Sequence, residues 1–286
     1  TLTNQGIELE VGYKLSVDKV NLSFLANASY VKNEIKNLGN QTGYIDKESL
    51  PTLGTVSRNQ NGYPIGYFFG YKAIGVFQTQ EEIDNYISPA TGKPIQPNAV
   101  PGDTKFEDLN GDGVISDDNE DRTMIGKPNP DWMVGLTVAA DWNGFDFSAF
   151  FQGSFGADVF DALRRYELAA VNYTSDALER WTGPGTSNSM PRIVLGDTPK
   201  NFRPSTLLVH DASFLRLRNL QVGYTLPAQL TRKAYIQRLR FYASFDNLLT
   251  ITGYKGMDPE IGSTMGIDKG VYPQARVYTF GLNLTF

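Results

Sequence analysis

The chain has 286 residues, a net charge of −5, 41% hydrophobic residues and no cysteine, with a mean hydropathy of −0.31. This acidic balance argues against nucleic acid as a partner, and the lack of cysteine excludes disulfides and thiol chemistry. Since no segment approaches the roughly 20 apolar residues of a membrane-spanning helix, only a closed barrel of strands would carry this chain through a bilayer.

Apolar residues alternate with polar or small ones in seven segments, which is the side-chain period of a β-strand. In the first segment, Ile7, Leu9 and Val11 alternate with Glu8 and Glu10. One apolar and one charged face are typical of barrel strands, whose faces meet lipid and lumen. The predicted strands are residues 6–15, 20–30, 132–142, 145–155, 214–224, 238–248 and 275–286.

Three local signals refine this pattern. Asn143-Gly144, between the third and fourth segments, predicts a two-residue hairpin. Trp132 and Trp142 lie about ten residues apart on one face, which fits a tilted strand with an aromatic residue at each membrane interface. The apolar phase of the fifth segment slips by one residue near Arg218-Asn219, which predicts a β-bulge.

Short and long connections alternate, as in barrels with short periplasmic turns and long external loops. The predicted extracellular loops are residues 31–131, 156–213 and 250–274. Seven strands with termini on opposite sides cannot close an antiparallel barrel, so we expect an all-β chain that forms part of a larger transmembrane antiparallel β-barrel. Tyr63–Tyr71 also alternates weakly, and we place it in an external hairpin within the first long loop.

Asp108–Ile115 reproduces the first positions of an EF-hand-type calcium loop. Asp108, Asn110 and Asp112 offer side-chain oxygens at positions 1, 3 and 5, and Val114 offers its carbonyl. Position 12 holds Asn119 in place of the usual bidentate Glu. The alternative is an acidic turn that binds no metal. The acids near enough to close the site are Asp117, Asp118, Glu120 and Asp121.

Aromatic residues crowd the predicted loops. They suit stacking on sugar rings or gripping a partner, but packing of loop against loop is the alternative, because most aromatic residues are buried for their area. Residues 158–170 have a helical pattern, and Glu81-Glu82 lies in a second helical stretch. The candidate substrate or partner contacts are Tyr63, Tyr67, Phe69, Tyr71 and Trp181.

Catalysis has no support in the sequence, and we expect no enzyme. The single histidine, His210, precedes a predicted strand, and no G-x-S-x-G elbow accompanies it. Nucleotide-binding loops and the H-E-x-x-H metal motif are also missing.

Several motifs, in order along nearly the whole chain, resemble the C-terminal third of SusC/RagA-type TonB-dependent outer-membrane transporters. By role, Asp121 matches the closing acid of the family's acidic loop, although the segment before it is two residues longer here. The matching stretches are Asn110–Gly113, Asp121–Thr123, Gly126–Trp132, Ala212–Leu220, Gly223–Pro227, Asp246–Leu249 and Tyr254–Glu260.

This resemblance implies the C-terminal portion of a barrel of about 22 strands in the outer membrane of a Gram-negative bacterium. The plug domain and the TonB-contacting box would lie upstream of this chain. A SusD-like surface lipoprotein would close over the long loops, with a glycan or peptide as cargo, and the only cofactor expected is Ca²⁺. The predicted lumen-lining residues are Glu8, Glu10, Lys14, Arg238, Arg240 and Asp246.

Two other readings compete with an importer of oligomeric nutrients. One is a self-contained eight-stranded barrel that uses Tyr63–Tyr71 as a strand and serves as a structural anchor or adhesin. The other is a secreted soluble β-protein whose calcium-pinned loops bind carbohydrate. The uniformly apolar outward faces of the strands argue against the soluble protein.

Overall fold

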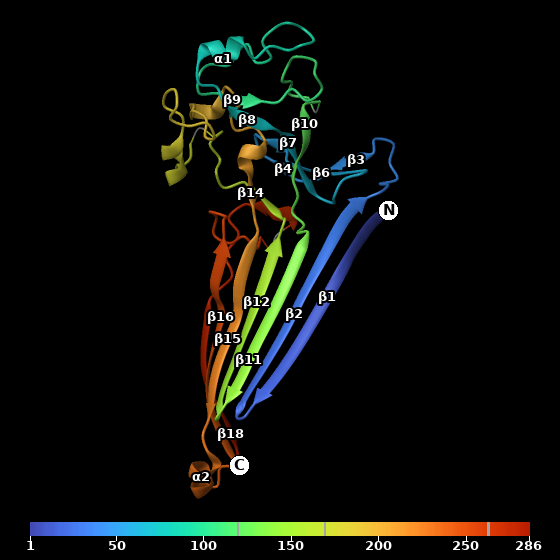
Figure 1. The fold of residues 1–286 in the computed structure, drawn as a ribbon. Coiled ribbons are helices and arrows are strands. Elements are labelled where there is room, and N and C mark those ends of the chain that lie inside the picture. Colours follow the sequence, from blue (N-terminus) through green and yellow to red (C-terminus); the bar gives the residue numbers. More distant parts are fainter. Residues whose placement is uncertain (119, 169, 262–263) are drawn as a thin grey trace.

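The computed structural model describes residues 1–118, 120–168, 170–261 and 264–286. Seven long strands form one curved antiparallel sheet, in which each strand pairs with the next long strand along the chain (Figure 1). The seven segments with strand periodicity are these seven strands. They are β1 (Leu2–Val17), β2 (Val20–Ile35), β11 (Trp132–Trp142), β12 (Phe145–Phe155), β15 (Phe214–Thr225), β16 (Arg238–Thr252) and β18 (Val277–Thr285).

Three of these strands are longer than the sequence pattern suggests. β1 and β2 pair from Val17 and Val20 at the turn to Leu2 and Ile35 at the far end, because the backbone ladder continues where the apolar alternation fades. β16 likewise continues to Thr252. β18 is shorter than expected, beginning at Val277 and ending before Phe286.

The two local backbone features predicted for the sheet, a two-residue hairpin and a β-bulge, are confirmed. Asn143 and Gly144 both have positive φ, 47° and 87°, the conformation that a two-residue hairpin needs to follow the twist of its strands. The register of β15 against β12 shifts between Leu217 and Asn219, which leaves Arg218 as the bulged residue.

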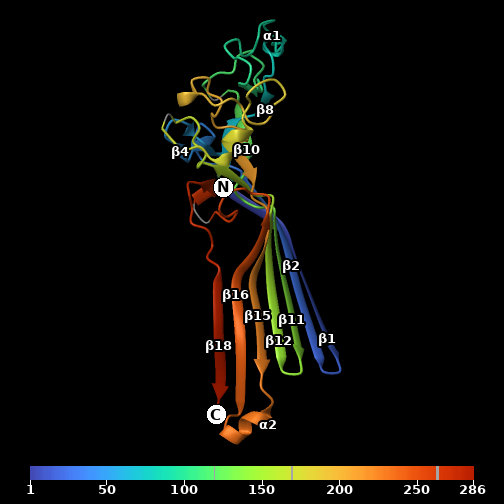
Figure 2. The same cartoon turned by 90° about the vertical axis from the view of Figure 1, so that its left-hand side faces the viewer.

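The long connections gather at one end of the sheet and form a second body, the loop module, made of the described residues within 36–131, 156–213 and 253–276 (Figure 2). The N-terminus lies at this end, and the C-terminus lies at the end of the short turns. The module holds β3 (Tyr44–Asp46), β4 (Ser49–Leu50), β5 (Gly54–Thr55), β6 (Ser57–Gln60), β7 (Tyr67–Tyr71), β8 (Ala73–Val76), α1 (Gln80–Asp84), β9 (Thr104–Phe106), β10 (Arg122–Gly126), β13 (Asp158–Asp161), β14 (Val209–Asp211) and β17 (Ile267–Asp268).

Short helices complete the description. α2 (Ala228–Thr231) lies at the turn end of the sheet, together with the 3-10 turn η4 (Arg232–Ala234). Further 3-10 turns in the module are η1 (Ser175–Glu179), η2 (Leu195–Asp197), η3 (Thr206–Leu208) and η5 (Thr264–Gly266). Within the described residues, none of the helices has the length and apolar character needed to cross a membrane.

Tyr63–Tyr71 adds no strand to the large sheet. Its β7 pairs with β6 and β10 in a separate four-stranded sheet of the loop module, with the order β10-β7-β6-β3. The predicted hairpin is therefore present, and the eight-stranded barrel that needed this segment as a wall strand is not favoured. Its extracellular position stays a prediction.

The helix expected over residues 158–170 is wrong. Asp158–Asp161 is strand β13, which pairs with β14 on one side and β17 on the other. Val159 and Phe160 are both buried, in two neighbouring apolar clusters of the module. Consecutive buried residues that point to opposite sides suit a strand packed between two layers, because successive side chains of a strand alternate.

Candidate functional site

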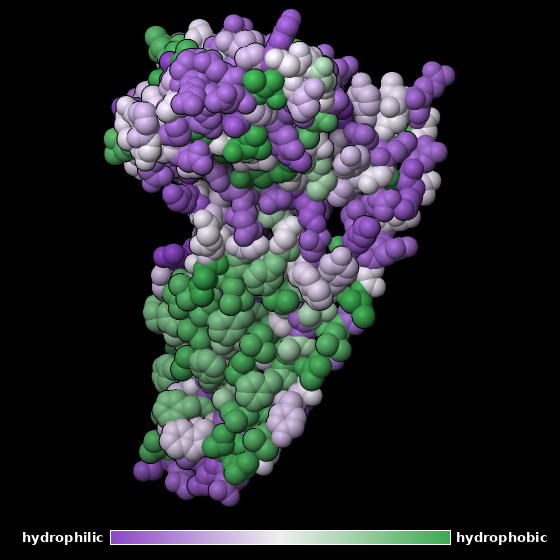
Figure 3. Space-filling view, turned by 45° about the horizontal axis from the view of Figure 1, so that its top comes forward, coloured by the Kyte–Doolittle hydropathy of each residue, from purple (hydrophilic) through white to green (hydrophobic). Residues whose placement is uncertain are grey.

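The outer face of the large sheet is apolar from the short turns up to the level of Tyr30 and Trp132. The register places Val11, Leu136 and Leu217 in one row, with Ala26 and Phe151 between them. Apolar surface covers the strands while polar surface dominates the loop module (Figure 3). Such an exposed apolar area on a single sheet is typical of a lipid-facing barrel wall.

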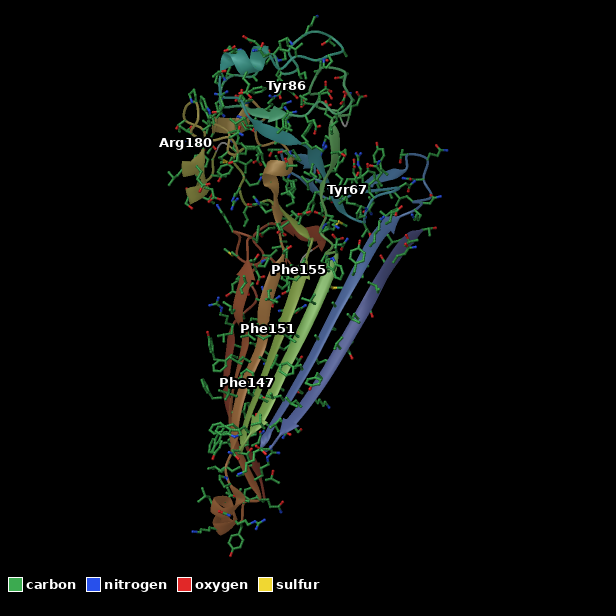
Figure 4. All side chains as sticks on the ribbon, viewed as in Figure 1. Tyr67, Tyr86, Phe147, Phe151, Phe155 and Arg180 are labelled. Atoms are coloured by element: carbon green, nitrogen blue, oxygen red, sulfur yellow. The ribbon has the colours of Figure 1, made fainter. Side chains whose placement is uncertain are left out.

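Aromatic residues bound this apolar face at both ends. At the module end, the rings of Tyr30 and Trp132 lie 5.0 Å apart. At the turn end, the ring of Phe145 lies 4.4 Å from Tyr224 and 6.3 Å from Trp142. Phe147, Phe151 and Phe155 follow one another along β12 between the two ends (Figure 4). Two aromatic bands separated by the strand length match the two interfaces of a membrane.

The opposite face of the sheet is polar. The register aligns Lys14 with Ser23, Ser148 and Gln221, and other rows of the same parity carry further charges. All six predicted lumen residues lie on this face, at different heights. Glu8 and Glu10 lie toward the loop module, and Arg238 and Arg240 lie toward the turns.

An ion pair lies on this face near the turns. The Nε of Arg240 donates to Oδ1 of Asp146 on β12 over 2.8 Å. The same guanidinium lies 5.1 Å from the ring centre of Tyr242. Asp146 was not among the residues predicted from the sequence, although it alternates in the same phase as the predicted ones.

A larger charged network lies where this face meets the loop module. Arg216 on β15 donates to Oδ1 of Asp258 over 2.5 Å and to Oε2 of Glu260 over 3.0 Å. Arg218 contacts both carboxylate oxygens of Glu260 at 2.6 Å. Arg216 is only 1% exposed, and its Nε also donates to the hydroxyl of Thr250 over 2.9 Å. This network fastens the connection between β16 and β18 to the inner wall.

Backbone amides complete the surroundings of Asp258. Burial alone would raise the pKa of this carboxyl, but hydrogen bonds from the amides of Gln274 and Glu260, together with the Arg216 guanidinium, hold the pKa below its usual range. The carboxylate is therefore charged and fully partnered. A buried charge network of this kind fixes its segments in one arrangement, because removing either partner leaves the other charge buried alone.

Sequence reasoning missed this network. Arg216 and Arg218 lie in the Ala212–Leu220 motif, and Asp258 and Glu260 lie in the Tyr254–Glu260 motif, both of which carry the family resemblance. Two arginines spaced by two residues in an apolar strand were the available signal. Their acidic partners lie about 40 positions later in the chain, and no local pattern connects them.

A cavity of about 400 Å³ lies beside this network, between the polar face and the loop module. The sheet contributes Met133, Gln152 and Phe214, and the segment fastened by the arginines contributes Pro259 and Glu260. Asp158 also lines it, and burial raises the pKa of that carboxyl. The cavity thus combines an apolar lining with two carboxyl groups at the mouth of the sheet's polar face.

No family model matches the chain. It is 34% identical to TonB-dependent receptor P3 of Formosa agariphila over 79% of this chain and 23% of that protein. It is 30% identical to TonB-dependent receptor SusC of Bacteroides thetaiotaomicron over the whole chain and 26% of that protein. A solved structure of the RagAB peptide transporter covers the whole chain and 29% of its own chain, with a TM-score of 0.75 and 25% identity.

The chain belongs to the SusC/RagA type of TonB-dependent receptors. It spans less than a third of the length of the relatives it matches. Receptors of this type lie in the outer membrane of Gram-negative bacteria, which agrees with the lipid-facing wall described above. The family and the barrel fold expected from the sequence are confirmed.

The loop aromatics of this SusC/RagA-type chain are largely internal. Tyr67, Phe69 and Tyr71 lie in β7 and are at most 4% exposed. Phe69 is covered by two guanidinium groups, with the Cζ of Arg58 at 3.6 Å and that of Arg122 at 4.3 Å from its ring centre. Their burial leaves almost no ring surface for a ligand, which argues against the predicted role of these three residues as substrate or partner contacts.

The two other candidate aromatics are only half-buried. Tyr63 stacks on Tyr67 with ring centres 4.9 Å apart. Trp181 lies against Gly102, where a Cβ atom would overlap its ring, and its Nε1 donates to Gln78 over 3.1 Å. Both rings keep some free surface in the loop module, and their role in binding stays a prediction.

The acidic loop forms a compact turn stabilised by its own carboxylates. Asp108 accepts hydrogen bonds from the amides of Gly111 and Gly113, both at 2.8 Å. Asp121, which is fully buried, accepts from the amides of Leu109 and Ser116 at 3.1 Å and so joins both ends of the loop.

Side chains that suit a cation are only partly gathered in this loop. Asn110 donates to Asp112 and to Glu120, each over 3.0 Å. Val114, whose carbonyl is the fourth predicted ligand, lies two residues after Asp112 in the chain. Within the described residues, no three carboxylate or imidazole side chains gather in a metal-binding arrangement. Asn119, the expected twelfth position, lies outside the described residues.

Proposed function

We propose that this chain forms part of the wall and the external loops of an active importer that takes up oligomeric nutrients across the outer membrane. The observation that carries this proposal is the two-faced sheet, with an apolar face between aromatic bands and a charged face that leads up to a cavity under the loop module. The named relatives, TonB-dependent receptors and SusC, support the same function.

We further propose that the remaining barrel strands and a plug domain complete this wall. Each edge strand of the sheet, β1 and β18, pairs on one side only within the described residues. An unpaired barrel edge is costly in lipid, where no water satisfies the free backbone groups, so neighbouring strands are needed on both sides. Energy for uptake would come from the TonB complex, which the names of the relatives imply.

A SusD-like surface lipoprotein is the proposed external partner. The matched solved structures are those of the RagAB peptide transporter and of the RagAB peptide importer in its open-open and closed-closed states. In this chain, the loop module supplies the large exposed polar body that such a partner would cover. The cargo would be a glycan or a peptide, held at the mouth of the polar face.

The test uses the intact transporter in its native cells. A strain without the gene should fail to deplete at least one oligosaccharide or peptide pool that the parent strain consumes, and dissipating the proton-motive force should abolish the difference. Glu260→Gln should lower that uptake several-fold at an unchanged outer-membrane level, because it removes a charge from the cavity wall and unpairs Arg218. Asp18→Asn, which removes a carboxylate from the exposed turn between β1 and β2 at the other end of the sheet, is the matched control.

Identical depletion by parent and deletion strains would contradict the importer. If the parent takes up the substrate and Glu260→Gln does so equally well, the importer function is supported, but the cavity is not part of the substrate path.

We also propose that the acidic loop binds Ca²⁺ and so pins the first long loop. The support is its match to the first half of an EF-hand-type loop and its closure by the buried Asp121. Asp108, Asn110, Asp112 and the Val114 carbonyl would be the ligands, with Asp121 holding the loop closed. Elemental analysis of the intact protein after dialysis against calcium should find one more equivalent than in Asp112→Asn. Equal calcium contents would contradict the site.

A further inference from the structure

The turn between β15 and β16 differs from the other two turns at its end of the sheet. Val17 pairs with Val20 and Trp142 pairs with Phe145, so both of those turns have two residues. Residues 226–237 instead form α2 and η4, which extend beyond the strand ends (Figure 1). Two residues are enough to join antiparallel neighbours, so the longer turn needs another reason.

Charge in this turn has one sign only. Residues 226–237 contain two basic residues, Arg232 and Lys233, and no acidic one, and Arg238 follows as the first residue of β16. Arg232, Lys233 and Arg238 are exposed, and none of them forms a salt bridge with a residue that the structure describes. Elsewhere on this sheet arginines are paired, as in Arg240 with Asp146.

Apolar side chains of the same turn are exposed beside these charges. Leu230 is 61% exposed and Tyr235 is 90% exposed. An apolar residue next to basic residues, together with an aromatic residue that has a polar tip, is the composition of segments that lie in a membrane interface. In water alone, these two side chains would have no favourable contact.

The backbone holds the turn in one shape. The amide of Leu226 donates to the carbonyl of Leu239 over 2.9 Å, and that of Gln237 donates to Thr285 of β18 over 2.8 Å. Tyr235 has a φ of 59°, a conformation that a bulky residue adopts at a cost. The exposed groups are therefore presented by a fixed scaffold and not by a loose loop.

Position along the strands sets the depth of the turn. Tyr224 ends the outer face of β15 in the aromatic band with Phe145, and residue 226 begins the turn directly beyond it. Since aromatic bands lie at the level of lipid headgroups, groups just past the band lie among the phosphates. The turn thus lies at the level of the headgroup layer.

From this charge, exposure and depth, we propose that residues 226–237 bind anionic phospholipid headgroups in the leaflet at the turn end of the barrel. Arg232 and Lys233 contact the lipid phosphates, while Leu230 and Tyr235 lie beside them in the headgroup layer. Attraction between basic side chains and an anionic leaflet is the physical basis. This lipid site is separate from cargo uptake, and it holds whether or not the cargo cavity is used.

The experiment measures lipid binding to the intact purified transporter. Native mass spectrometry in mild detergent, with phosphatidylglycerol or phosphatidylcholine added at defined concentrations, gives the affinity for each lipid. We expect a preference for phosphatidylglycerol, and we expect Arg232→Gln combined with Lys233→Gln to weaken its binding roughly tenfold. Lys19→Gln, an exposed lysine in a two-residue turn at the same end, should leave the affinity unchanged.

Folding of each variant is checked by its heat-dependent mobility on gels, which reports an intact barrel. Equal binding of both lipids by the parent protein would overturn the proposal. So would unchanged phosphatidylglycerol binding in the folded double variant, or an equal loss in Lys19→Gln. Loss of a co-purifying periplasmic protein with unchanged lipid binding would instead assign the turn to a protein partner and also overturn the proposal.

Discussion

The large sheet and the loop module follow opposite rules for where apolar residues lie. In the sheet, Ile7 is 67% exposed and Phe280 is 76% exposed, while Arg216 is buried. In the module, Phe68 and Phe77 are fully buried and the surface is polar. The same chain is thus folded for two solvents, with lipid around the strands and water around the loops.

This difference changes what stabilises each region. The module contains apolar clusters of its own, such as the one that includes Phe68, Phe160 and Ile267, and burial of these side chains in water supplies its stability. The outer face of the sheet has no such cluster to cover it. Its apolar side chains gain their favourable surroundings from lipid, and its cohesion comes from the backbone ladders between strands.

Truncating a phenylalanine in each region gives the largest contrast. Phe68→Ala should destabilise the module by about 3–5 kcal/mol, since it leaves a cavity in a fully buried cluster. Phe280→Ala removes the same atoms from a lipid-facing position and should change the stability of the folded barrel in lipid far less. Hydrogen exchange of residues 54–71 in the intact protein measures the first effect, and urea unfolding from vesicles measures the second.

Equal losses for the two variants would break the comparison, because they would mean that Phe280 is packed against protein. Tyr278→Ala, two residues away on the same face of β18, serves as an independent check of the lipid-facing position.

The second-largest expected effect on stability comes from placing a charged side chain on one face or the other of a single strand. Leu136→Arg puts a cation on the lipid face near the middle of β11 and should cost about 2–4 kcal/mol in lipid. Ala139→Arg puts the same side chain on the polar face, beside Ser23 and Ser148, and should cost little. The measurement is urea-induced unfolding of the intact barrel in vesicles, followed by heat-dependent gel mobility. Similar unfolding midpoints would show that both faces meet water.

Much of the sheet was readable from the sequence because its signals are local. Alternation with period two, the Asn143-Gly144 turn and the phase slip at Arg218 each occupy a few adjacent residues, and backbone geometry links them directly to structure. Lipid also imposes a uniform requirement along the whole outer face, so the pattern repeats from strand to strand.

The loop module was less readable because distant segments decide its structure. Val159 and Phe160 form a strand only because β14 and β17, far along the chain, pair on both sides. The buried state of Phe69 depends on Arg58 and Arg122, which come from two other strands. The pairing of Arg216 with Asp258 likewise joins a strand to a later loop. None of these contacts leaves a periodic trace in the sequence.

The smallest expected difference between the two regions is a pH dependence of stability that affects only the loop module. Asp197 in η2 is buried, and this burial raises its pKa to about 6 although the amides of Asn201 and Phe202 donate to it. Because the folded pKa lies above the unfolded value of about 3.9, protonation favours the fold. The contribution is complete below about pH 4 and is lost as the pH rises through 6, a change on the order of 2–3 kcal/mol.

Asp197→Asn removes this titration. The difference between parent and variant in the hydrogen-exchange rate of residues 190–205 should therefore change as the pH rises from 4 to 7. Asp84→Asn, at the exposed end of α1, is the control, and its difference from the parent in exchange rate should not change with pH. Because the outer face of the sheet has no such buried carboxyl to titrate, exchange in β11 should be the same in parent and variant at every pH. If the difference in exchange rate between parent and Asp197→Asn did not change with pH, Asp197 would be charged throughout this range. The two amide donors would then stabilise its carboxylate more than burial destabilises it.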